Sequence, residues 1–97
     1  MSEVIPLLRA ELDLQAAYDR YDEFGLGWKL DTQLAKIFEH LARFPHFGRI
    51  YRGTIRRVAL RRFPYALCYT VEGSRVLLQA FLDTRQSPGA IDRHLGL

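Results

Sequence analysis

The hydrophobic periodicity of the chain changes after residue 43, and this change is the feature that most restricts its fold. From residue 10 to residue 43, apolar side chains recur every three or four positions, the spacing of an amphipathic helix. From residue 55 they tend to occupy every second position, the spacing of a strand with one buried face. Helices followed by strands predict an α+β fold.

Two helices are predicted in the first part of the chain. The first covers about residues 10–24, and the second ends near Arg43. Gly25 and Gly27 interrupt the helical pattern and allow a tight reversal, so the two helices should lie antiparallel. Trp28 stands at the start of the second helix. We expect its side chain to anchor the hairpin.

Strands are predicted before and after this hairpin. Residues 4–8 form a short apolar segment in which Pro6 cannot donate a ladder hydrogen bond, so an edge strand is expected. Further strands are predicted at residues 55–60, 65–71 and 75–82, and the last is apolar enough to be central. Ser87 and Pro88 suit the start of a short terminal helix. The predicted order is therefore β-α-α-β-β-β, with that helix at the end.

The same patterns predict which side chains are buried. In the strand at residues 75–82, alternation places Val76, Leu78, Ala80 and Leu82 on one face. The expected core draws on both helices and on the two longest strands. Its members are Leu14, Ala17, Tyr18, Tyr21, Leu34, Ile37, Phe38, Leu41, Leu67, Tyr69, Val76 and Leu78.

Length and composition set further bounds. A chain of 97 residues with 48% hydrophobic and 26% charged residues suits one globular domain, here residues 1–97. No apolar run approaches the roughly 20 residues of a membrane span, and residues 1–10 do not have the form of a secretion signal. We therefore expect a cytoplasmic protein. Cys68 is the only cysteine, which excludes an internal disulfide.

Charge is distributed unevenly along the chain. Residues 1–43 carry five basic and eight acidic side chains, whereas residues 44–97 carry nine arginines and three acids. Six of these arginines fall within residues 49–62, where there is no acid. A clustered positive field attracts anionic partners, either nucleic acid or an acidic protein segment, although a solvated basic edge would have the same composition.

The sequence offers few groups for catalysis or metal binding. His40, His46 and His94 lack the spacing of metal ligands, so no metal site is expected. Cys68 lies inside a predicted strand with no basic residue beside it to lower the pKa of its thiol, which favours a structural role. No glycine-rich phosphate loop occurs, and we expect no cofactor.

These features together resemble the RelE/ParE superfamily of toxins from type II toxin-antitoxin modules, and most closely its ParE-like, plasmid-stabilisation branch. The resemblance covers about residues 4–91 and is strongest over residues 56–71, RRVALRRFPYALCYTV. That segment is similar to the family's arginine-led strand, its Phe-Pro-Tyr corner and its Tyr-x-Val strand. The acid and tyrosine pattern of residues 11–21, the helix exit at 41–48 and residues 84–88 support it.

The resemblance implies a helical hairpin packed on a twisted antiparallel sheet of three to four strands. It also implies an antitoxin that wraps the toxin in a hetero-oligomer. The toxin is then expected to associate with operator DNA only through this antitoxin. ParE-like toxins poison DNA gyrase by binding it. RelE-like toxins are enzymes that cut messenger RNA on the ribosome.

Residue chemistry favours the gyrase-binding hypothesis. RNA cleavage needs groups that transfer protons, and arginine stays protonated. The chain has no lysine after Lys36, and Ile91 stands where RelE-like nucleases have a tyrosine. His46, His94, Asp83 and Tyr51 are the remaining candidates in the basic half. ParE-like toxins commonly have histidine at the position of Asp83 and a basic residue at that of Gln86, so an inactive relative that only binds antitoxin is a third hypothesis.

The resemblance also suggests which residues bind which partner. We expect Arg57, Arg61 and Arg85 to contact the target, with Arg56 and Arg62 as weaker candidates. If the strand at residues 55–60 continues, alternation places Arg57 and Arg61 on one side of it and Arg56 and Arg62 on the other. The residues expected to contact the antitoxin are Tyr18, Tyr21, Arg52 and Tyr65. No catalytic residue is assigned.

Overall fold

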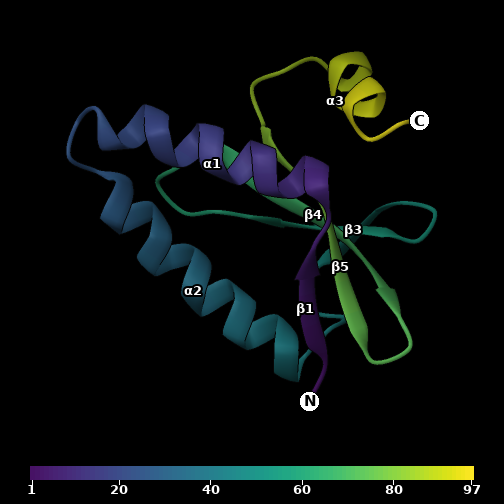
Figure 1. Cartoon of the computed structure of the whole chain (residues 1–97). Helices are drawn as coiled ribbons and strands as arrows, with labels where there is room; N and C mark the ends of the chain where they lie inside the picture. Colours follow the sequence, from purple (N-terminus) through teal and green to yellow (C-terminus); the bar gives the residue numbers. More distant parts are fainter.

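The computed structural model describes residues 1–97 and contains a five-stranded sheet with helices on both faces (Figure 1). The strands lie in the order β1-β5-β4-β3-β2, and every neighbouring pair is antiparallel except β1 and β5. This arrangement confirms the predicted α+β class. In chain order the elements are β1 (Glu3–Pro6), α1 (Leu8–Asp22), α2 (Gly27–Arg43), β2 (Arg49–Arg52), β3 (Ile55–Ala59), β4 (Tyr65–Glu72), β5 (Arg75–Asp83) and α3 (Pro88–His94).

The predicted helical hairpin is present. Its helices run in opposite directions and diverge from the turn between them (Figure 1). Gly25 has a φ of +70°, and a Cβ atom on Gly27 would lie 2.7 Å from the ring of Tyr18, so the turn needs both glycines. Trp28 is 63% exposed. The expectation that it anchors the hairpin is therefore wrong, and the contact of Tyr18 with Gly27 closes the turn instead.

The sheet has one strand more than the sequence pattern indicated. β2 has the sequence RIYR and pairs with β3, and its four residues show too little hydrophobic alternation to be recognised. β5 lies between β1 and β4, which confirms its central position, and β1 is an edge strand as expected. No helix has both the length and the apolarity that crossing a membrane would require.

A bulge in β5 changes which of its side chains face the hairpin. Cys68 is paired with Ala80 but Tyr69 is paired with Leu78, so Gln79 is an extra residue in β5. Val76 and Leu78 consequently belong to the main core, whereas Ala80 and Leu82 belong to a second cluster. The prediction that these four residues share one face is wrong, because the bulge reverses the alternation.

The core divides into one cluster on each side of the sheet. The main cluster lies between the hairpin and the sheet and contains every predicted core residue except Tyr18, with Leu14, Tyr21, Ile37 and Phe38 partly buried at its margin. Tyr18 lies outside it, so its assignment to the core is wrong. The second cluster is Cys68, Ala80, Leu82 and Ile91, with Tyr51, Ile55 and Leu95 packed against it.

α3 covers this second cluster and confirms the predicted terminal helix. The Ser87 hydroxyl accepts a hydrogen bond from the backbone NH of Ala90, which caps the first turn. Asp92 accepts one from the Tyr51 hydroxyl at 2.9 Å and pairs with Arg52 at 3.0 Å. The ring of His94 contacts the Asp13 carboxylate of α1 at 2.8 Å. Polar contacts with β2 and α1 therefore hold α3 in place.

Candidate functional site

The predicted target-binding arginines lie on both sides of the sheet. Val58 belongs to the core beneath the hairpin, whereas Cys68, the partner of Arg57 on β4, belongs to the cluster beneath α3. Because β3 side chains alternate, Arg56 faces the hairpin side and Arg57 the α3 side. The fold thus separates neighbouring residues of the arginine-led strand.

Arg56 supports the chain between α2 and β2. Its guanidinium donates hydrogen bonds to the carbonyl oxygens of Gly48 at 2.9 Å and His46 at 3.2 Å. Tyr69 hydrogen-bonds the same segment. Its hydroxyl donates to Pro45 O and accepts from Gly48 NH, each at 2.8 Å. The guanidinium of Arg56 therefore has a structural role. To contact the target as predicted, the same guanidinium would have to bind the target as well as these two carbonyl oxygens.

Arg61 does not share a surface with Arg57. β3 ends at Ala59, and the loop that follows turns toward α2, where the Gln33 side chain hydrogen-bonds both the NH and the carbonyl oxygen of Arg61. Arg62 has a φ of +68°, a left-handed conformation that redirects the chain toward Phe63. The alternation that would align Arg57 with Arg61 fails, because the strand ends before Arg61.

This loop forms one wall of a groove beside α2, which we call the α2 groove. Apolar side chains along it include Trp28, Ile37, Phe47, Val58 and Phe63. The groove is also lined by Lys29, Lys36, Arg61, Arg62 and His40, and no acidic residue lines it. An apolar floor with a basic rim suits an amphipathic acidic segment.

Arg85 is bound within the chain. Its guanidinium lies 2.6 Å from the carboxylate of Asp83, and its own backbone NH also donates to that carboxylate. The hydrogen bond from the Arg85 side chain is the main reason why the pKa of Asp83 falls to about 2. Arg85 is therefore a target-binding candidate whose charge already has a partner.

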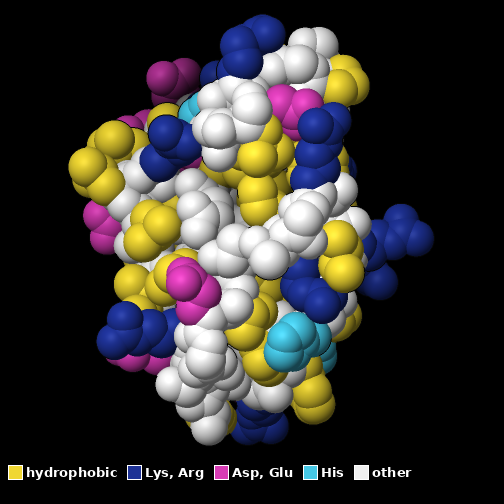
Figure 2. All heavy atoms as spheres, turned by 90° about the vertical axis from the view of Figure 1, so that its right-hand side faces the viewer, with side chains coloured by type: hydrophobic (Ala, Val, Ile, Leu, Met, Phe, Trp, Pro, Cys, Tyr) yellow, Lys and Arg dark blue, Asp and Glu magenta, His cyan; other side chains and the backbone are white.

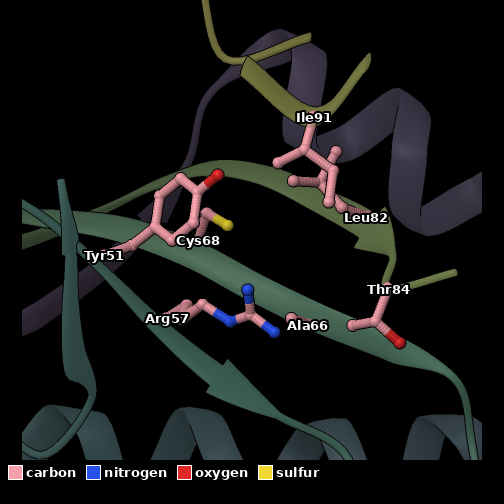
Figure 3. A pocket seen from close by; sticks show the side chains of 7 residues that line it. All are labelled: Tyr51, Arg57, Ala66, Cys68, Leu82, Thr84 and Ile91. Carbon is pink, nitrogen blue, oxygen red and sulfur yellow. The ribbon is translucent and has the colours of Figure 1, made fainter. Parts of the chain in front are cut away.

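Arg57 lines a shallow pocket beneath α3, which we call the Arg57 pocket (Figure 3). Its guanidinium lies 5.7 Å from the centre of the Tyr51 ring, and Ala66, Cys68, Leu82 and Ile91 form apolar walls. The pocket has room for little more than a water molecule. Burial raises the pKa of the Cys68 thiol to about 11, so the pocket contains no thiolate at neutral pH.

Three of the four predicted antitoxin-binding residues lie on the hairpin side. Tyr65 is buried, stacked on Phe81, and accepts a hydrogen bond from Arg20 at 3.2 Å. Tyr21 contacts Phe63 and Tyr65 edge to face, while Tyr18 is partly exposed at the turn. Arg52 is on the α3 side, paired with Asp92. The structure does not bring all four residues together.

Three of the four acid-base candidates have polar partners within the fold. Tyr51 donates to Asp92, Asp83 accepts from Arg85, and His94 pairs with Asp13. The hydrogen bond to Asp92 raises the pKa of Tyr51. His46 is exposed at the corner after α2. No three His, Cys, Asp or Glu side chains lie together as metal ligands would.

Sequence reasoning did not identify Arg49 and Gln33 individually. Arg49 lies on β2 directly opposite Arg57. Its basic character was visible in the sequence, but its position followed only from a strand that the pattern did not indicate. In Figure 2, most of the visible acidic side chains lie in the left-hand half of the view, whereas the charged side chains in the right-hand half are mostly basic.

Both the sequence and the fold of the chain are similar to known proteins. A family model described as the ParE toxin of the type II toxin-antitoxin system parDE matches residues 4–88. A solved structure described as the chromosomal ParDE toxin-antitoxin system from P. aeruginosa has a similar fold, with a TM-score of 0.73 at 20% identity. The alignment covers 88% of this chain and 98% of that one. A search of curated proteins found no match.

Proposed function

The chain belongs to the ParE toxin family of type II toxin-antitoxin systems, and from this premise we propose that it binds and inhibits DNA gyrase until a cognate antitoxin masks it. The family implies the antitoxin partner. The choice of gyrase over ribosome-bound messenger RNA rests on the chemistry of the basic half of the chain. We further propose that residues 1–97 act as one toxin domain in the cytoplasm.

One observation carries the preference for binding over RNA cleavage. Of the titratable side chains that could transfer protons, Tyr51, Asp83 and His94 each have a polar partner within the fold. Cleavage through the 2′-hydroxyl requires a base and an acid on either side of one phosphate. Arginines can bind a charged partner without such groups, which supports a toxin that acts by binding.

We propose that Arg57, Arg61 and Arg85 contact the target, with weaker contributions from Arg56 and Arg62. No hydrogen bond or ion pair within the chain occupies the guanidinium of Arg57, Arg61 or Arg62. Arg61 and Arg62 line the α2 groove, and Arg85 is paired with Asp83. The target would therefore contact more than one face, or only some of these arginines would contribute.

We further propose that the antitoxin occupies the hairpin side of the molecule. The basic rim of the α2 groove complements an acidic segment, and its apolar floor would supply most of the binding free energy. Tyr21 lines this groove and can contact the antitoxin directly, whereas Tyr65 is buried and would act only by supporting the Tyr21 ring. Tyr18 and Arg52 would contact only an antitoxin that wraps beyond the groove.

The experiment that tests this function compares the two targets directly. The purified chain should inhibit the supercoiling activity of gyrase and should leave ribosome-bound messenger RNA intact. The product of a neighbouring short reading frame should co-purify with the chain and restore supercoiling. Codon-specific messenger RNA cleavage would replace the gyrase hypothesis with the nuclease alternative, and antitoxin binding with neither activity would indicate an inactive relative.

A further inference from the structure

Two arginines face each other on the α3 side of the sheet without an acceptor between them. Arg49 on β2 and Arg57 on β3 are directly paired in an antiparallel ladder. Residues paired in this way carry their side chains on the same face, with Cβ atoms about 5 Å apart. Like charges at that separation repel, so the arrangement costs folding free energy.

Three other arginines in and just beyond the sheet have partners within the chain. Arg52 pairs with Asp92, Arg56 with the carbonyl oxygens of Gly48 and His46, and Arg85 with Asp83. Arg75 lies opposite Glu72 in the β4–β5 ladder. Arg57 is partly buried, and its only charge-related contact is with the Tyr51 ring. A partly buried guanidinium without an acceptor is poised to bind an anion.

No acidic side chain of this chain pairs with Arg49 or Arg57. Asp92 is the nearest acid on α3, and Tyr51 and Arg52 already occupy its oxygens. Cys68 stays a thiol at neutral pH. The Arg57 guanidinium projects between the Tyr51 ring and Thr84, with Ala66 beyond it (Figure 3). An anion bound by both Arg49 and Arg57 would therefore come from another molecule.

We propose that Arg57 and Arg49 form a binding site for one carboxylate, supplied by an aspartate or glutamate side chain of a protein partner. A planar guanidinium binds a carboxylate through two parallel hydrogen bonds. The Arg57 pocket holds little more than a water molecule and Arg49 does not line it, so the carboxylate would lie at its mouth, where the tip of a side chain fits beneath α3 more readily than a phosphodiester flanked by two sugars. The partner is the target, a step that rests on the proposed function.

The site can be tested without the target. The Arg Nε–Hε signals of the 15N-labelled full chain are followed by NMR while acetate replaces chloride at constant ionic strength, with methyl phosphate in a parallel titration. The Arg57 signal should shift saturably, with half-saturation on the order of 10–100 mM acetate, as one charge-assisted pair implies. The Arg75 signal should show no saturable shift. An Arg57 signal that does not saturate, or one that saturates at tenfold lower methyl phosphate, overturns the carboxylate site.

A stability measurement separates binding from packing. Acetate should raise the Tm of the wild-type chain and of Arg75→Gln above the Tm in chloride at the same ionic strength, because a ligand that binds only the folded state stabilises it. Arg57→Gln should lose the part of this rise that is specific to the site. An equal rise in Arg57→Gln and Arg75→Gln would mean that the contact of Arg57 with Tyr51 is purely structural, and would overturn the proposal.

The two proposals can fail separately. A saturable Arg57 shift without gyrase inhibition would keep the carboxylate site and remove gyrase as its partner. Gyrase inhibition that survives in both Arg49→Gln and Arg57→Gln would keep the target and overturn the role of this site in binding it.

Discussion

The side chain of Gln33 on α2 holds the backbone of Arg61 from both sides. Its amide nitrogen donates to Arg61 O at 2.9 Å, and its amide oxygen accepts from Arg61 NH at 2.7 Å. These two residues lie 28 positions apart in the sequence. The contact ties the loop after β3 to the second helix, and it therefore fixes one wall of the α2 groove.

Gln33→Ala should loosen this wall. Loss of two largely exposed hydrogen bonds is expected to lower the free energy of unfolding by about 1–2 kcal/mol, and the Arg61 amide should exchange its hydrogen faster. Urea denaturation and amide exchange measure the two effects. Gln86→Ala is the matched control, since Gln86 is exposed and its side chain has no such contact. Unchanged exchange at Arg61 would show that other contacts hold the loop.

Tyr69→Phe should destabilise the fold through the segment after α2. The hydroxyl of Tyr69 is the acceptor for Gly48 NH, and a Cβ atom on Gly48 would lie 2.7 Å from that hydroxyl, so no other group fits there. Leaving a buried NH without an acceptor costs about 1–3 kcal/mol. Tyr21→Phe, which removes a hydroxyl from a partly exposed ring, should cost less. Equal unfolding free energies for the two variants would contradict this account.

The Asp83–Arg85 pair should contribute to the pH dependence of stability. The pKa of Asp83 is about 2 in the folded chain and 3.8 in its ordinary state. The unfolded chain therefore binds the proton first as pH falls, and the stabilisation present above about pH 4 is lost between pH 4 and pH 2. Asp83→Asn and Arg85→Gln should both reduce the loss of unfolding free energy between pH 4 and pH 2. The effect should be small, because Arg85 is largely exposed and solvent screens the pair.

Arg49→Gln should stabilise the chain at low salt. Removing one of two facing arginines relieves a repulsion that costs about 0.2–1 kcal/mol, and added salt should shrink the gain because it screens exposed charges. The gain in stability is measured as the shift in the urea concentration at the unfolding midpoint, at low and at high ionic strength. Arg75→Gln, which removes an arginine opposite Glu72, should not stabilise the chain. A stabilised Arg75→Gln would point to general charge reduction instead.

Toxicity should depend on arginines that bind and not on groups that titrate. Replacing Arg57 and Arg85 together by alanine should abolish growth arrest upon expression while the chain still folds and co-purifies with its antitoxin. Arg75→Ala should leave growth arrest unchanged. His46→Ala should also remain toxic, because a binding mechanism needs no proton transfer at that exposed residue. Loss of toxicity in His46→Ala alone would favour the nuclease alternative.

The amino-acid sequence determined those features of the fold that depend on interactions between residues close together along the chain. Helical spacing in residues 10–41 and alternation in residues 65–71 predicted the element types, since side-chain direction follows from local backbone geometry. The apolar run at residues 75–82 predicted that β5 is central, because only a strand with neighbours on both sides and a covered face can bury it. The arginine cluster and the family resemblance could also be recognised from the sequence alone.

Only the tertiary structure decided which of these arginines can act together. The bulge at Gln79, the end of β3 at Ala59 and the contact with Gln33 each change the direction of side chains that simple alternation would place elsewhere. The pairing of Arg49 with Arg57 exists because β2 joins the edge of the sheet. The physical reason is that these features arise from hydrogen bonds between distant segments, whose free energy depends on the folded arrangement and leaves no periodic signal in the sequence.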